Sequence, residues 1–88
     1  MQTILVCDDD KEIVEAIEIY LQQEGFHVLK AYDGEEALEI LKNNEVHLLI
    51  MDVMMPKLDG LQVLTALREQ GVATPVLLLT QKARSKTA

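Results

Sequence analysis

Short apolar runs alternate with longer amphipathic segments along the chain, and this alternation constrains the fold more than any other feature of the sequence. Runs rich in aliphatic residues occupy 3–7 (TILVC), 26–31 (FHVLKA), 46–51 (VHLLIM) and 76–79 (VLLL). The segments between them carry apolar side chains at helical spacing. Strands that alternate with helices of this length predict an α/β fold, a parallel sheet with helices on both faces in the order βαβαβαβ.

Signals at the helix ends fit this order. Asp10 precedes the first helical segment as a candidate N-cap, and Gly25 follows it where a helix would end. Asp33 and Glu36 have the spacing of a capping box, and Asp59–Gly60 opens the third helix. The apolar side chains at helical spacing, which we expect to face the core, are Ile13, Ile17, Tyr20 and Leu21, then Ala37, Leu38 and Leu41, then Leu61, Leu64 and Leu67.

Composition narrows the class of protein. With 88 residues, 49% hydrophobic and 26% charged, the sequence predicts one small globular domain. The net charge of −7 argues against nucleic-acid binding by this segment, and no apolar stretch approaches the length of a membrane span. We expect no signal peptide, and the single cysteine, Cys7, excludes an internal disulfide. These features together predict a cytoplasmic protein.

Polar residues gather where the predicted strands end. Asp8 and Asp9 follow the first strand, Asp52 ends the third and Thr80 ends the fourth. The carboxyl ends of parallel strands are where ligands bind in open α/β sheets, so we expect these side chains to meet. Converging carboxylates repel one another unless a cation lies between them, and carboxylate oxygens open to water suit Mg²⁺. Taken singly, the Asp8–Asp9 pair also fits an N-cap cluster, and Asp52 also fits the start of a loop.

With these residues placed, the chain resembles the receiver domain of two-component response regulators, the phosphoacceptor modules of bacterial signalling. The resemblance rests on ILVCDDD at 4–10, AYDGEEAL at 31–38, LLIMDVMMPKLDG at 48–60 and PVLLLT at 75–80. It implies a flavodoxin-like sheet with strand order 2-1-3-4-5.

The resemblance also implies a role for each matching residue. Asp52 would be the phosphoacceptor and would take a phosphoryl group from a histidine kinase. Mg²⁺ would be held by Asp8, Asp9, Asp52 and the backbone carbonyl of Met54. Thr80 would be the switch hydroxyl that moves towards the phosphoryl group. The module would therefore signal as a phosphoprotein and would not be an enzyme, beyond its own phosphorylation and dephosphorylation.

The match ends after the fourth predicted strand. We therefore expect a partial receiver domain over 1–80, lacking helix 4, strand 5 and helix 5 of the family, and a basic tail of uncertain structure over 81–88. The family's lysine at the end of strand five would be absent, which predicts slower phosphorylation of Asp52. The outer side of 76–79 would lack a neighbouring strand, so we expect a homodimer or larger homo-oligomer through this strand.

Two other functions remain open at this point. One is a truncated or engineered receiver fragment that self-associates and has lost efficient phosphotransfer. The other is a Mg²⁺-dependent phosphohydrolase, whose nucleophile would be Asp8 with Asp10 two residues on; Glu12 occupies the position where that class carries Thr or Val. Mapping a trapped phosphoryl group to Asp8 or to Asp52 separates the phosphohydrolase from the receiver.

Overall fold

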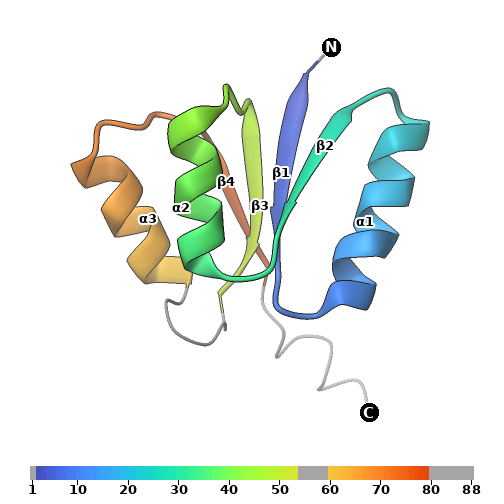
Figure 1. Ribbon diagram of the computed structural model, residues 1–88, viewed down its shortest axis with the longest axis horizontal. Helices are drawn as coiled ribbons and strands as arrows, with labels where there is room; N and C mark the ends of the chain where they lie inside the picture. Colours follow the sequence, from blue (N-terminus) through green and yellow to red (C-terminus); the bar gives the residue numbers. More distant parts are fainter. Residues whose placement is uncertain (1, 54–59, 80–88) are drawn as a thin grey trace.

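The computed structural model describes residues 2–53 and 60–79 and shows four parallel strands in one sheet, in the order β2-β1-β3-β4. This confirms the predicted flavodoxin-like arrangement as far as the described chain extends (Figure 1). The elements are β1 (Thr3–Cys7), α1 (Lys11–Gln23), β2 (His27–Ala31), α2 (Gly34–Asn43), β3 (Leu48–Asp52), α3 (Gly60–Glu69) and β4 (Val76–Leu79). In this part of the chain, no helix is both long and apolar enough to cross a membrane.

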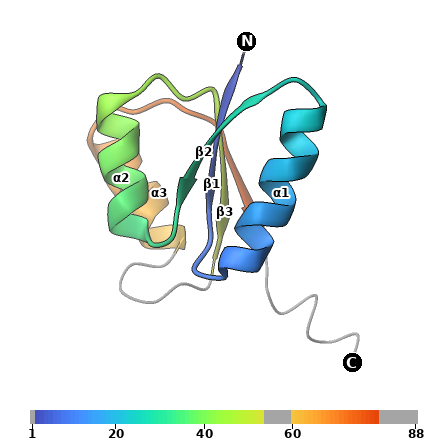
Figure 2. The same ribbon diagram turned by 45° about the vertical axis from the view of Figure 1, so that its right-hand side comes forward.

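The sheet lies between two helical layers, as predicted. Figure 2 shows α1 on one side of the sheet and α2 with α3 on the other. Because side chains alternate along a strand, β1 contributes to both layers. The side chains buried on the α1 side are Ile4, Val6, Val14, Leu21 and Val28. Those buried on the α2–α3 side include Leu5, Cys7, Leu49, Met51, Val63 and Leu67.

The third strand begins later than its apolar run predicts. β3 covers Leu48–Asp52, whereas the prediction was 46–51. Its first pair with β1 is Leu48 with Ile4, and Val46 is buried without belonging to the strand. At the other end Asp52 pairs with Leu79 of β4. Asp52 is therefore the last residue of a strand whose neighbours lie on both sides, which fixes the position of its backbone.

Both predicted N-caps are present. The Asp10 carboxylate accepts hydrogen bonds from the backbone N–H groups of Glu12 and Ile13, at 3.0 and 3.4 Å. At the start of α2, Asp33 accepts from the Glu36 N–H at 2.9 Å, and the Glu36 carboxylate accepts from the Tyr32 N–H at 2.7 Å. The cap residues thus fix the chain directly after β1 and β2, at the edge of the sheet that carries the acidic residues. Asp59, expected to open α3, lies outside the described residues.

Removing the α2 cap gives a first testable prediction. Asp33→Ala leaves the Glu36 N–H without its side-chain acceptor, so we expect the free energy of unfolding to fall by about 1 kcal/mol. Urea denaturation followed by circular dichroism measures this change. Asp33→Asn keeps a capping oxygen and should lose much less. Equal losses in the two variants would mean that the charge of Asp33, and not its capping bond, stabilises the helix start.

Two side chains expected in the core are exposed, and for these the prediction was wrong. Tyr20 of α1 is 62% exposed and Leu61 of α3 is 57% exposed. The apolar stripe of each helix is wider than the strip that touches the sheet, and Leu21 and Leu67 occupy the buried positions. Leu77 of β4 is also 51% exposed, and β4 is an edge strand within the described sheet. Assembly of copies through β4 stays a prediction.

Candidate functional site

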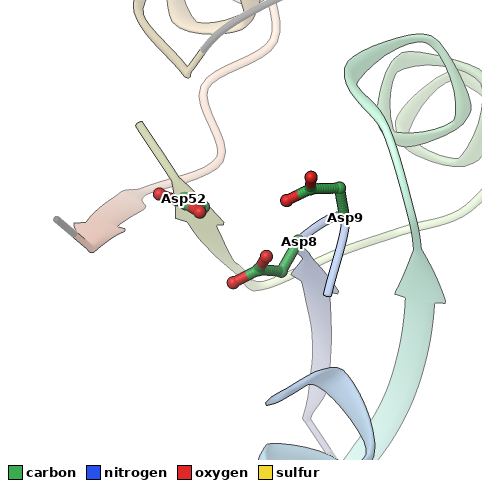
Figure 3. Close-up of side chains that lie close together, drawn as sticks. All are labelled: Asp8, Asp9 and Asp52. Atoms are coloured by element: carbon green, nitrogen blue, oxygen red, sulfur yellow. The ribbon is translucent and has the colours of Figure 1, made fainter. Parts of the chain in front are cut away.

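Two aspartates meet at the carboxyl edge of the sheet because β1 and β3 are neighbours. Cys7 pairs with Met51, so the residues that follow them, Asp8 and Asp52, take adjacent places at the ends of the two strands. Asp9, one residue further along the chain, completes the group. One carboxylate oxygen from each of the three side chains lies within 4.8 Å of the others (Figure 3). The gathering expected from the sequence is therefore present for these three residues.

The three carboxylates differ in their access to water. Asp8 is 1% exposed and Asp52 is 0% exposed, whereas Asp9 faces solvent. The Asp8 carboxylate accepts a hydrogen bond of 3.0 Å from the backbone N–H of Asp10. The cluster therefore has two buried acids at its base and one acid at its open side.

Burial and the neighbouring carboxylates raise the pKa of one member of this cluster, Asp8. Burial is the main cause that raises the pKa of Asp8 from 3.8 to about 6. The hydrogen bond from Asp10 N–H opposes this rise, and the negative charge of Asp52 and a hydrogen bond with Asp9 add to it. An acid kept partly protonated near neutral pH marks a place where negative charge is in excess. A cation at this place would be favoured for the same reason.

Cys7 lies directly before the cluster and is not a nucleophile of the site. Burial raises the pKa of its thiol to about 12, and nearby carboxylates reinforce the shift. These carboxylates belong to Asp33, Asp8, Glu36 and Asp52. The thiol stays protonated and contacts the Asp33 carbonyl oxygen at 3.4 Å. Asp33 and Glu36, which follow β2, therefore add negative charge near the carboxyl edge of the sheet.

The residues present fit a magnesium ion. Oxygen ligands on one Mg²⁺ lie about 2.9–4.2 Å apart, because each Mg–O bond is about 2.0–2.1 Å long. The separations in the cluster reach 4.8 Å, so small side-chain rotations would bring the three oxygens around one ion. The exposed Asp9 side leaves room for the water ligands that Mg²⁺ retains.

Other residues singled out from the sequence cannot be placed. Thr80 and Met54 lie outside the described residues. Conversely, the structure places Lys11 with its ammonium nitrogen 5.5 Å from the centre of the Tyr32 ring, a contact that the sequence reading did not predict. The sequence did carry a signal for this contact, since Lys11 and Tyr32 follow the ends of β1 and β2, which are adjacent in the sheet. This pair adds a cation close in sequence to Asp8 and Asp9.

Comparisons with known proteins agree with this geometry. The family model of the response regulator receiver domain matches residues 4–88. The alkaline phosphatase synthesis transcriptional regulatory protein PhoP of Bacillus subtilis is 44% identical over 79 residues, 90% of this chain and 33% of that protein. The transcriptional regulatory protein CpxR of Klebsiella pneumoniae is 48% identical over 82 residues, 93% of this chain and 34% of that protein. The chain thus spans about a third of the length of these curated relatives.

Solved structures show the same likeness. The receiver domain of the Francisella response regulator 1452 superposes with a TM-score of 0.87 and 39% identity, covering 91% of this chain and 66% of that one. The response regulator TrrA of Thermotoga maritima, solved in complex with Mg(2+)-BeF, gives a TM-score of 0.86 and 37% identity over 97% of this chain and 76% of that one.

Proposed function

The chain belongs to the family of response regulator receiver domains, and on this premise we propose that Asp52 is its phosphoacceptor and that the chain signals through the phosphorylation of this residue. One observation carries the proposal: a buried strand-end carboxylate meets two further carboxylates at the ligand-binding edge of a parallel sheet. Asp52 is the last residue of β3, which pairs with β1 and β4, and its side chain is fully buried.

Mg²⁺ would be bound by Asp8, Asp9 and Asp52 together with the backbone carbonyl of Met54. When bound, the ion would neutralise the charge that the carboxylates and an incoming phosphoryl group bring to one place. The chain's own contribution is to hold three carboxylate oxygens within 4.8 Å of one another while leaving Asp9 open to solvent. This arrangement lets a phosphodonor approach from the exposed side.

In the transfer step a carboxylate oxygen of Asp52 forms a bond to phosphorus, which gives an acyl phosphate. The bond between phosphorus and the histidine nitrogen of the kinase breaks, and its electron pair returns to the imidazole. Thr80 would donate its hydroxyl to a phosphoryl oxygen. A histidine kinase as donor and a cytoplasmic location are parts of this proposal that rest on family membership.

In this proposal the chain consists of a receiver segment over 1–80 and a basic tail over 81–88. The receiver segment would catalyse no reaction beyond its own phosphorylation and dephosphorylation.

Site mapping tests the proposal directly. The 88-residue chain is treated with a small phosphodonor and Mg²⁺, the acyl phosphate is reduced with borohydride, and the modified residue is identified by peptide mass spectrometry. We expect modification at Asp52. Modification at Asp8 would favour the aspartate-nucleophile phosphohydrolase instead, and an unmodified chain with an intact fold would contradict both.

A magnesium titration gives an independent prediction about the cluster. Adding Mg²⁺ should shift the amide resonances of Asp8, Asp9 and Asp52, because their carboxylates would bind the ion. Since the pKa of Asp8 is about 6, protons compete with the ion, and the affinity should be about tenfold weaker at pH 5 than at pH 8. Asp9→Asn should weaken binding, whereas Asp10→Asn, which keeps the helix cap, should not. Undisturbed Asp8 and Asp52 amides at saturating Mg²⁺ would refute the magnesium site.

A further inference from the structure

The amino edge of the sheet, opposite the acidic cluster, holds a histidine whose ring contacts two other residues. β1 pairs with β3 from Ile4 onward, so Thr3 lies one residue before the first pair of these strands. Thr3 is nevertheless bonded twice to His47. Its carbonyl accepts a hydrogen bond of 2.8 Å from the His47 backbone N–H, and its own N–H donates to Nδ1 of the His47 ring at 2.9 Å. The imidazole thus takes the place of a backbone carbonyl as the acceptor for a strand N–H.

The hydrogen bond from Thr3 depends on the protonation state of the ring. A ring nitrogen accepts a hydrogen bond only while it carries no proton, so Nδ1 of His47 is unprotonated in this contact. Imidazole is the side chain whose charge ordinarily changes between about pH 5 and pH 8. A protonated imidazole donates from both nitrogens and would turn an N–H towards the N–H of Thr3. Protonation of His47 therefore breaks this hydrogen bond.

The second neighbour of the ring offsets only part of that loss. Nε2 of His47 lies 3.7 Å from Oε2 of Glu45, so a charged ring gains an ion pair. The Glu45 side chain is 87% exposed, and water screens ion pairs of such exposure until they contribute little. The N–H of Thr3, in contrast, loses its acceptor. The two protonation states therefore differ in the partner of the ring, which is Thr3 when the ring is neutral and Glu45 when it is charged.

Other ionisable groups at this edge do not replace His47 in this role. They are His27 at the start of β2, Lys42 in the last turn of α2, and Arg68 and Glu69 at the end of α3. His27 pairs with Thr3 through the backbone, from the other side of β1. Arg68 donates to two carbonyl oxygens of the loop between α3 and β4. In the described part of the chain, none of the four forms an ion pair with His47.

We propose that His47 is a pH-sensitive hydrogen-bond acceptor, which holds the amino end of β1 while its ring is neutral and loosens it when the ring is protonated. The loosened part is Thr3 on its β3 side, since Ile4 is held by strand pairs with both β2 and β3. The proposal does not depend on phosphotransfer or on Mg²⁺, because His47 precedes β3 and Asp52 is its last residue.

Nuclear magnetic resonance of the ¹⁵N-labelled 88-residue chain tests the proposal without any substitution. At pH 8 we expect an unprotonated Nδ1 of His47 and a scalar coupling across the hydrogen bond between Nδ1 and the Thr3 amide nitrogen. At pH 5 the coupling should be lost. Protection of the Thr3 amide against hydrogen exchange, corrected for the intrinsic effect of pH, should then fall about fivefold, as expected for one hydrogen bond. A protonated Nδ1 at pH 8, or a coupling that persists once the ring is charged, would overturn the proposal.

Substitutions at the two histidines then identify the responsible ring. His47→Asn supplies an amide oxygen that does not titrate, so protection of the Thr3 amide should be equal at pH 5 and pH 8. His47→Ala removes the acceptor and should give the low protection at both pH values. His27→Asn is the matched control, because it removes the other histidine beside Thr3, and it should keep the pH dependence of the wild type. PH dependence that is lost in His27→Asn, or retained in His47→Ala, would contradict the assignment to His47.

Discussion

Replacement of Asp52 by asparagine is expected to reduce phosphoryl incorporation to the background of the assay, a loss of at least about a thousandfold. The amide of asparagine is not nucleophilic, so the bond to phosphorus cannot form. The substitution is nearly isosteric and removes one negative charge from a buried, crowded acidic cluster, so the fold should be retained. The measurement is incorporation from a small phosphodonor in the presence of Mg²⁺, quantified by intact mass.

The matched control for Asp52→Asn is Asp10→Asn. Asp10 follows the same cluster in sequence and caps α1, and asparagine also serves as an N-cap, so this variant changes the charge by the same amount without touching the proposed nucleophile. We expect it to incorporate phosphate at a rate within about threefold of the wild type. Retained incorporation in Asp52→Asn would show that another acid accepts the phosphoryl group.

Replacement of Asp8 by asparagine is expected to stabilise the metal-free fold at pH 8 by about 1–3 kcal/mol. In the folded chain burial raises the pKa of Asp8 to about 6, above the ordinary value of 3.8. The folded state therefore binds more protons than the unfolded state between these two values. Stability is lost as the pH rises from about 4 through about 6, and above that range the cost of the buried charge is fully present. Asparagine fills the same space without that charge.

Urea denaturation of the wild type and Asp8→Asn at pH 4.5 and pH 8, in the presence of a chelator, measures this difference. The unfolding free energies of the two proteins should differ clearly less at pH 4.5 than at pH 8. Saturating Mg²⁺ at pH 8 should then stabilise the wild type more than the variant, because the ion would neutralise the Asp8 carboxylate, which the variant lacks. Parallel behaviour of the two proteins across this pH range would show that Asp8 titrates normally in the folded chain.

The order of elements was predictable because hydrophobic periodicity reports what each segment buries. β1 and β4 cover the same residues as their apolar runs, 3–7 and 76–79. β3 was placed two residues early because burial and strand pairing are different properties: Val46 is buried before the strand starts. The exposure of Tyr20 was not predictable, since a helical wheel shows which side chains are apolar but not how wide a strip the sheet covers.

The gathering of Asp8, Asp9 and Asp52 was predictable from the rule that parallel strands present their carboxyl ends at one edge. The different exposure of Asp8 and Asp9 within the cluster was not predictable. That Asp8 is buried while Asp9 is exposed depends on the turn between β1 and α1, which the Asp10 cap shapes. The contact of Lys11 with Tyr32 likewise depends on two loops whose path no periodicity describes.

The strand order has a consequence for how the molecule is made. β1 is synthesised first, yet its partner on one side, β3, follows 44 residues later, as the pairing of Ile4 with Leu48 shows. A nascent chain that ends before β3 therefore exposes one long edge of β1 and keeps Asp8 and Asp52 from meeting. Long-range parallel pairing of this kind forms slowly, because the chain entropy of closing the loop is lost before the contacts form. The acidic cluster therefore forms only when β1 and β3 pair, and the proposed binding of Mg²⁺ would report this pairing in a nascent chain.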